Sequence, residues 1–458
     1  MRLGTRAVAT AGVLLAAAAI ASVGGSASAS THSAVAKAHA PRVGKFGGIV
    51  RPHLTSGVRS DAIGMDGPVG TPPLIFHGGP VMGTRSTHNK VVITPIYWSG
   101  TGGETFAASY GSLINKFLKD SAKDSEKSSN VFSTLFEYNG SNGNINYHFT
   151  FAPAINVAGF PASGCTVNGG PIYSDNSGYT RCIDDAQAIS AIANATAGKP
   201  YDNGHIYVLF LPKHVESCFF AGNPGNQACT INSTPSAAYC AYHSEGPGTM
   251  VYAMMPFPIY KSATGFSCTD EQLGAVPAIQ SPNNNIDADV EISPLSHEIS
   301  EAVTDPDTTT GWYDSSGYEN GDECAYIYGA LGGVNGGFFN QTINGHHYLT
   351  QEEFSNFNFN GGHGGCLQGY VPGVAPAVTS VGPSSGSVAG GNTVTIQGTH
   401  LAGVTSVTFG GTPATFKLVD NGKIKATAPA HAAGTVDVRI TTAAGTSPIV
   451  AADKYTYS

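Results

Sequence analysis

The eight cysteines constrain this chain more than any other feature of its sequence. All of them lie between residues 165 and 366 of a chain of 458 residues. An even number of cysteines in an exported chain indicates a framework of up to four disulfides. Pairing each cysteine with its sequence neighbour predicts the bridges Cys165–Cys182, Cys218–Cys229, Cys240–Cys268 and Cys324–Cys366. None of them has the Cys-x-x-Cys spacing of a thiolate zinc site, so we expect no such site.

The N-terminus has the three parts of a secretory signal peptide. Arg2 and Arg6 give a positive start, Val8–Val23 is largely apolar, and Ala27-Ser28-Ala29 has the small-x-small pattern of a cleavage site. This pattern predicts cleavage after Ala29 and a secreted, extracellular protein. No later segment has about 18 unbroken apolar residues, so we expect no membrane span after cleavage.

The charge balance argues against nucleic acid as a partner. The chain has 22 Lys+Arg against 31 Asp+Glu, a net charge of −9, whereas phosphate binding requires a basic face. Charged residues make up only 12% of the chain, which also has 59 glycines. This composition is typical of a loop-rich extracellular protein, and it leaves the oligomeric state open.

Changes in composition divide the chain into five parts. Residues 30–74 have no clear period and are locally basic, which suits a linker or a propeptide. Residues 371–376 (VPGVAP) have the Pro/Gly content of a hinge. The expected order is a signal peptide 1–29, a linker or propeptide 30–74, a central domain 75–370, a hinge 371–376 and a C-terminal domain 377–458.

Strand and helix patterns alternate through residues 75–370. Apolar runs predict strands, and apolar residues at helical spacing predict helices. The expected strands are Lys90–Trp98, Ile145–Phe151, His205–Leu211 and Met250–Pro256, and the expected helices are Thr105–Lys119, Ile183–Ala195 and 293–304. This alternation predicts an α/β fold, with a mainly parallel or mixed sheet and helices packed on it. Residues 317–366 are rich in Gly and Asn and are expected to form loops.

The C-terminal part has the pattern of an all-β domain. Short runs rich in Val and Thr recur every 8–12 residues, which predicts a small β-sandwich. The expected strands are Thr393–Gln397, Ser406–Phe409, Ala414–Leu418, Lys423–Ala428 and Thr435–Thr442. The stretches GGNTVTIQGTHL, SVTFGG and AAGTVDVRITTAAGTS resemble the IPT/TIG immunoglobulin-like domain. The resemblance implies an accessory or binding module.

The segment EISPLSHEISEAVTDP places possible metal ligands on one helix. Ser293 suits the N-cap and Pro294 the first helical position, so we expect a helix that runs to about Thr304. His297 and Glu301 stand at i and i+4 and therefore project from one face. This is the spacing that two metal ligands on one helix need.

Glu298 follows the first of these ligands directly. In the related His-Glu-x-x-His arrangement, this glutamate is the general base that activates water. We therefore predict that Glu298 is the catalytic residue of a zincin-like HExxE helix. A catalytic zinc site has three protein ligands and one open position. We expect Glu319 of the acidic loop YENGDE to be the third ligand, with Asp322 as second choice.

Other side chains remain candidates at this site. Asp305, His346 and His347 could each supply the third ligand, and Tyr313 could donate to an oxyanion. Calcium is a competitor of zinc, because oxygen ligands suit it. The residues that would hold calcium are Asp305, Asp307, Glu319 and Asp322, or the stretch Asn283–Asp289, which is otherwise a turn.

Seven blocks of the central domain share their order with a known family. They are ITPIYWSG, VLFLPKHVESCF, CAYHS, SHEISEAVTDP, GWYD, ENGDECAYIYG and INGHHYLTQEEFSN. Together they resemble the exordium/phosphate-induced-protein family of secreted proteins. Its plant members have aliphatic residues in place of His297 and Glu298 and are described as cell-wall growth proteins. This chain resembles a microbial branch that keeps HExxE. The resemblance implies secretion and fold, and it leaves catalysis open.

Two hypotheses follow from these patterns. The first is a secreted metal-dependent hydrolase, a zinc metallopeptidase that acts on an extracellular protein or a cell-wall polymer. In it, Glu298 activates water, and His297, Glu301 and Glu319 or Asp322 hold the metal. The second is a non-catalytic extracellular protein that binds a cell-wall polymer or glycan and has a structural calcium site.

Overall fold

The structure is a computed structural model, and part of the chain is described in it. Residues 1–48 lie outside the described part, so the predicted signal peptide and most of the predicted linker are not tested. The described residues are 49–50, 53–54, 68, 70–161, 166–167, 170–171, 180–219, 228–230, 239–258, 266–268, 281–360, 364–370, 375–401, 403–420, 422–442 and 444–458.

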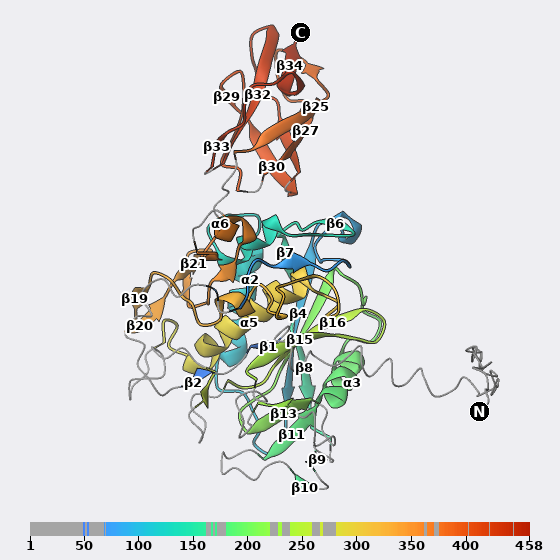
Figure 1. The fold of residues 1–458 in the computed structure, drawn as a ribbon, viewed down its shortest axis with the longest axis vertical. Coiled ribbons are helices and arrows are strands. Elements are labelled where there is room, and N and C mark those ends of the chain that lie inside the picture. The colour runs from blue at the N-terminus through green and yellow to red at the C-terminus, as the bar shows by residue number, and fades with distance from the viewer. Residues whose placement is uncertain are drawn as a thin grey trace, which may run out of the picture. The chain divides into compact units, whose positions relative to one another are not determined.

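A seven-stranded mixed sheet forms the centre of the part of the chain that precedes the C-terminal β-sandwich (Figure 1). Its middle strands are parallel, because β12 (His205–Phe210) pairs in parallel with β4 (Val91–Ser99) on one side and β16 (Met250–Met255) on the other. β15 (Ala241–Gly246) then pairs with β16 in antiparallel fashion. The remaining members are β1 (Ile49–Val50), β7 (Phe149–Phe151) and β8 (Ile155–Ala158).

Helices cover both faces of this sheet. α2 (Tyr110–Lys123) and α5 (Ile286–Thr304) pack against one face, and α3 (Asp185–Ala195) packs against the other. Alternate residues of β12 supply the two apolar layers, since Val208 and Phe210 face α5 while Tyr207 and Leu209 face α3. The predicted α/β class with packed helices is therefore confirmed.

The helix ends differ from those expected from the sequence. α2 begins at Tyr110 rather than Thr105, because Ser109 before it has a left-handed conformation with φ of 67°. α3 begins at Asp185, and Asp184 closes a capping box with Gln187 at its start. β7 is limited to Phe149–Phe151, although the preceding Ile145 and Tyr147 are buried.

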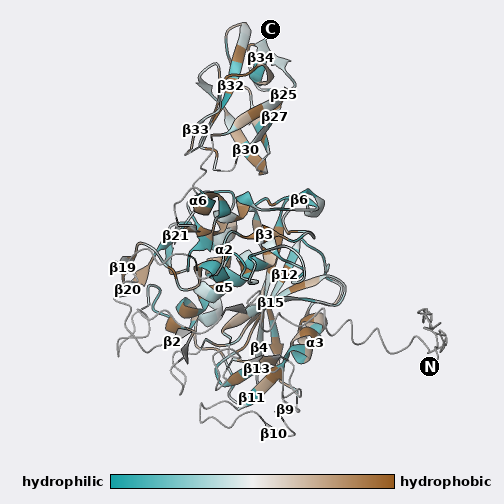
Figure 2. Cartoon of the chain, in the orientation of Figure 1, coloured by the Kyte–Doolittle hydropathy of each residue, from teal (hydrophilic) through white to brown (hydrophobic). Residues whose placement is uncertain are grey.

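The helix that carries HExxE is longer than predicted. α5 begins at Ile286, and the side chain of Asn285 accepts a hydrogen bond from the Ala288 N–H at 3.3 Å. The prediction that Ser293 is the N-cap is wrong, since Pro294 lies inside the helix. An interior proline removes one helical hydrogen bond. The helix persists because nearly all of its side chains are buried, although Figure 2 shows many hydrophilic residues along it.

Short elements and disulfides hold the segment that follows α5. It contains β18 (Trp312–Tyr313), the 3-10 turn η4 (Asp322–Cys324) and small hairpins instead of a plain loop. Three of the predicted disulfides are present, namely Cys218–Cys229, Cys240–Cys268 and Cys324–Cys366. Cys165 of the fourth predicted pair lies outside the described residues.

The C-terminal part is a β-sandwich, as predicted. One sheet has the order β25-β27-β31-β30, and the other contains β34, β32 and β28. Their bounds are β25 (Ala377–Gly382), β27 (Thr393–Thr399), β28 (Ser406–Phe409), β30 (Thr415–Asp420), β31 (Lys423–Thr427), β32 (Gly434–Thr442) and β34 (Lys454–Tyr457). Among the residues that the structure describes, no helix is long and apolar enough to cross a membrane.

Candidate metal centre

α5 brings the two expected helix ligands together. The Nε2 atom of His297 lies 2.8 Å from Oε1 of Glu301. Within the described part of the chain, neither ring nitrogen of His297 has a partner in hydrogen-bond geometry, in spite of this short distance. An imidazole nitrogen without a hydrogen-bond partner is available to bind a metal ion.

Asp322 completes a group with these two residues. Its Oδ1 atom lies 3.6 Å from Nε2 of His297, and its backbone N–H donates to Oε1 of Glu301 at 2.9 Å. One ligand atom from each of His297, Glu301 and Asp322 lies within 4.8 Å of the others, and all three side chains are buried. Metal–ligand bonds of about 2.0–2.2 Å place the donors of one ion at such separations. The three residues could therefore hold a metal ion.

Glu319, the expected third ligand, lies elsewhere in the cluster. Its Oε2 atom is 3.6 Å from Nε2 of His243. Its backbone N–H donates to Oδ2 of Asp322 at 3.4 Å, so it supports the turn that carries Asp322. The side chain that joins His297 and Glu301 is thus Asp322, the second choice of the sequence analysis.

His243 is a member of the cluster that the sequence analysis did not assign. It lies on β15, and its Nδ1 atom is 3.2 Å from Oε2 of Glu298 and 3.5 Å from Oε2 of Glu301. These three residues form a second group within 4.8 Å, also buried. The CAYHS block contains this histidine, but no local spacing relates it to the HExxE helix. Glu298 and Glu301, from one helix, thus both lie beside a histidine from the sheet.

The cluster is strongly coupled electrostatically. Burial lowers the pKa of His297, but Glu301 together with the charges of Glu298 and Glu353 outweighs burial and raises the pKa to about 10. Burial raises the pKa of Glu298 to about 7, although His243 opposes this shift. For Glu301, burial is overcome by the two histidines, which lower its pKa to about 2. Burial and the neighbouring carboxylates hold the pKa of Asp322 well above its ordinary value. The protonation state of each of these residues therefore depends on the charges of its neighbours.

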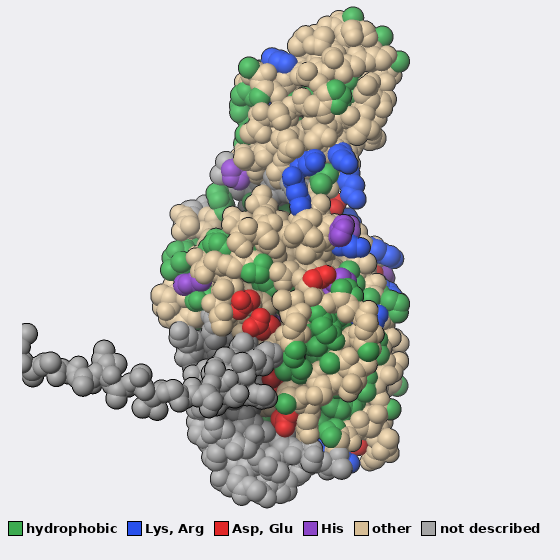
Figure 3. Space-filling model, turned by 90° about the vertical axis from the view of Figure 1, so that its right-hand side faces the viewer, with side chains coloured by type: hydrophobic (Ala, Val, Ile, Leu, Met, Phe, Trp, Pro, Cys, Tyr) green, Lys and Arg blue, Asp and Glu red, His purple; other side chains and the backbone are tan. Residues whose placement is uncertain are grey.

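A fifth carboxylate faces the same helix. Glu353 of β23 (Glu353–Phe354) is fully buried, and burial raises its pKa well above the ordinary value while His297 lowers it in part. The neighbouring Glu352 points elsewhere, since a Cβ atom on Gly329 would lie 2.1 Å from its Oε1. Uncharged side chains and backbone cover most of the face in Figure 3.

The other metal-ligand candidates from the sequence do not join the group formed by His297, Glu301 and Asp322. His346 pairs with Asp120 at 2.8 Å, and the ring of His347 stacks on Phe339 with centroids 3.9 Å apart. Among the described residues, neither histidine belongs to a group that could hold a metal. Asp305 contacts the cluster through its backbone, where its carbonyl oxygen lies 3.1 Å from Nε2 of His243.

The other residues considered for a calcium site and for an oxyanion donor make contacts that do not involve the cluster around His297. The carboxylate of Asp307 accepts hydrogen bonds from the N–H and hydroxyl of Thr309 at 3.1 and 2.7 Å. The stretch Asn283–Asp289 contains the N-cap of α5, and within the described residues it is not part of a metal-holding group. Tyr313 stacks on His77 with ring centroids 3.6 Å apart.

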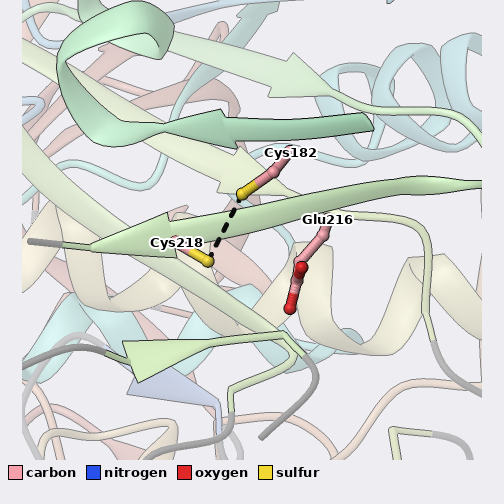
Figure 4. A group of neighbouring side chains, drawn as sticks. All are labelled: Cys182, Glu216 and Cys218. Carbon is pink, nitrogen blue, oxygen red and sulfur yellow. Dashed lines mark hydrogen bonds between the residues drawn. The ribbon is translucent and has the colours of Figure 1, made fainter. Parts of the chain in front are cut away.

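In a third group of candidate ligands, the sulfur atoms already form disulfide bonds. Figure 4 shows Cys182, Cys218 and Glu216 on neighbouring strands, and the two Sγ atoms lie 3.5 Å apart. Both cysteines are disulfide-bonded, Cys218 to Cys229. A cysteine binds a metal as the thiolate. This group therefore does not bind a metal through sulfur while the disulfides are intact.

Comparisons with known proteins concern a small part of the chain. Fibrocystin-L of Mus musculus is 40% identical over 67 residues, which are 14% of this chain and 2% of that protein. SGBP-B from a complex xyloglucan utilization locus in Bacteroides uniformis is 19% identical, with 23% of this chain and 26% of that chain covered and a TM-score of 0.17.

Gamma-CGTase from alkalophilic Bacillus clarkii is also 19% identical, with 31% of this chain and 18% of that chain covered and a TM-score of 0.17. A family model, the IPT/TIG domain, matches residues 376–457. The β-sandwich observed there agrees with that family. The C-terminal part of the chain is therefore an IPT/TIG domain.

Proposed function

We propose that this protein is a secreted metal-dependent hydrolase of the peptidase class. The observation that carries the proposal is the convergence of His297, Glu301 and Asp322 on one buried point, with Glu298 beside them. His297, Glu301 and Asp322 hold the metal, and Glu319 supports the position of Asp322. Imidazole and carboxylate ligands suit zinc, whereas calcium takes oxygen ligands only.

The role of Glu298 follows from its position. A divalent cation in this site supplies Lewis-acid polarisation of a carbonyl group and of water. Glu298 is next to His297 in sequence, and among the described residues nothing hydrogen-bonds to its Oε1 atom. That oxygen is able to accept a proton from water during attack on a carbonyl, the role of a general base.

The substrate class follows from the compartment. Disulfides form and persist in oxidising environments such as the extracellular space, and three are present here. The signal-peptide pattern in the sequence supports the same destination. We therefore propose an extracellular protein or cell-wall peptide as the substrate, with the IPT/TIG domain as a module that binds to a surface or polymer.

Two variants test this proposal against wild type. Glu298→Gln keeps the size of the side chain and removes the base, so we expect it to retain zinc and to lose hydrolysis of a mixed peptide library. His297→Ala removes a ligand, so we expect about one zinc per chain to be lost. Glu126→Gln, at a carboxylate that pairs with His148 outside the cluster, is the control. Full activity of Glu298→Gln, or unchanged zinc in His297→Ala, contradicts the proposal.

A second candidate function is supported by the complete burial of the cluster. The side chains of His243, His297, Glu298 and Glu301 are all fully buried. A metal that is closed off in this way suits a structural site in a non-catalytic protein that binds a cell-wall polymer. For that protein, deletion of 377–458 abolishes polymer binding, and Glu298→Gln has no effect on it.

A further inference from the structure

We infer that the buried cluster has a second divalent-cation position, formed by His243, Glu298 and Glu301, next to the first one. The inference rests on the proposed metal centre at His297, Glu301 and Asp322. Glu301 belongs to both groups of ligands. Its Oε1 atom faces His297 at 2.8 Å, and its Oε2 atom faces His243 at 3.5 Å. A carboxylate with one oxygen near each of two histidines would be able to bridge the two ions of a two-metal site.

The orientation of His243 supports the second position. Its Nε2 atom lies 3.1 Å from the carbonyl oxygen of Asp305, and a carbonyl can only accept, so Nε2 carries the proton of this hydrogen bond. Metal-binding histidines commonly donate their other N–H to a backbone carbonyl in this way. Nδ1 is then directed at Oε2 of Glu298 and Oε2 of Glu301. Three electron-rich atoms face one another there, and they require a proton or a cation between them.

The charge of the cluster favours a cation. Glu298, Glu301 and Asp322 are buried, and among the described residues no lysine or arginine forms an ion pair with them. Buried carboxylates are costly unless positive charge compensates them. A single divalent cation with neutral histidine ligands leaves part of this negative charge uncompensated. A second cation at His243 compensates the rest and displaces the proton from Nδ1.

The second position also affects the proposed chemistry. It uses Glu298 as a ligand, whereas the hydrolase proposal requires a carboxylate of Glu298 that is free to accept a proton. Occupation of the first position alone leaves Glu298 basic, whereas a second cation at its Oε2 atom would withdraw electron density from the whole carboxylate and make Oε1 a weaker base. The second cation is therefore a regulator of the same site.

Zinc stoichiometry tests the inference on the full-length protein. Equilibrium dialysis against zinc, followed by elemental analysis, should give two equivalents per chain for wild type. His243→Gln should hold one, and His346→Gln, which changes a histidine that pairs with Asp120 outside the cluster, should hold two. One equivalent in wild type overturns the second position and leaves the proposed metal centre standing. No bound zinc in wild type overturns both.

A measurement on wild type alone guards against a variant that fails to fold. The protein is loaded with one and then two equivalents of Mn²⁺, and its electron paramagnetic resonance spectrum is recorded. Two ions bridged by Glu301 give an exchange-coupled spectrum that appears only with the second equivalent. Two bound ions with spectra of isolated Mn²⁺ place the second ion elsewhere and overturn the inference.

Discussion

Gly321 lies directly against the imidazole ring of His297. A Cβ atom added at Gly321 would stand 2.7 Å from Cγ and 2.8 Å from Cδ2 of the histidine, which is closer than atoms in contact can approach. The backbone of the glycine is held in place, because the Gln351 side-chain amide donates to its carbonyl oxygen at 2.7 Å. The ring of His297 is thus positioned by a backbone segment that has no room for a side chain.

Gly321→Ala should therefore weaken metal binding. The methyl group displaces the ring of His297, and changes in the support of a metal ligand cost about 10–100-fold in affinity. Overpacking of a buried site also costs about 1–3 kcal/mol of stability. Gly333→Ala is the control, since the nearest atom to its Cβ is 3.9 Å away. Zinc affinity measured by competition with a chelator checks this expectation, and equal affinities of the two variants would contradict it.

Buried strands were the most predictable part of this fold. β12 and β16 end within one residue of the expected positions, because strands buried on both faces are continuous apolar runs. The start of α5 was not predictable by the same means. Ser293 and Pro294 satisfy the local rule for a helix start, but the packing of α5 extends the helix to Ile286. Local sequence does not show how completely a helix will be buried.

The candidate site likewise contains some residues that the local sequence predicts and others that only the tertiary fold brings there. His297, Glu298 and Glu301 share one helix, so their spacing was visible in the sequence. His243 reaches the site through the antiparallel pairing of β15 with β16, which places it opposite Ala253. Sheet register, rather than local spacing, determines that position. Glu353 comes from a separate two-residue strand and carries no spacing signal either.

Glu291 should make stability depend on pH. Burial raises the pKa of this carboxyl well above the ordinary 4.5, the nearby Tyr110 lowers it in part, and the charge of Asp287 raises it. The folded chain therefore keeps the proton at pH values where the unfolded chain has released it. Its contribution to stability is fully present below about pH 4.5 and is lost as the pH rises toward the folded pKa.

Glu291→Gln removes this titration. The free energy of unfolding of the variant, relative to wild type, should rise as the pH increases above the unfolded pKa, with a limiting slope of about 1.4 kcal/mol per pH unit. Urea unfolding of both proteins at pH 5, 6 and 7 measures the difference, and Glu126→Gln controls for the loss of a carboxylate outside the cluster. A difference that does not change with pH would show that Glu291 is ionised in the folded chain.

The Cys324–Cys366 disulfide should support metal binding as well as stability. Cys324 ends the 3-10 turn that begins with Asp322, so the bridge holds the turn that supplies a ligand. Changing both cysteines to serine should cost about 3–4 kcal/mol of stability, as for a long closed loop, and should lower zinc affinity. The same change at Cys218 and Cys229, on other strands, should lower stability and leave zinc affinity unchanged. Equal zinc affinities of the two double variants would contradict the role of the bridge.

Excess zinc should inhibit the proposed hydrolase. The first equivalent fills the position at His297, Glu301 and Asp322, and activity rises with it. Further zinc fills the position at His243 and engages Glu298 as a ligand. A general base contributes about 10²–10⁴-fold to a rate, so hydrolysis should fall by about 100-fold between one equivalent and saturating zinc.

Removal of the excess zinc by dialysis should restore the rate of hydrolysis. Calcium at the same concentration should not inhibit, because an imidazole nitrogen does not suit it. A rate that stays constant from one to ten equivalents of zinc would mean that Glu298 is never engaged as a ligand, and the regulatory role of the second position would then have to be abandoned even if a second ion binds.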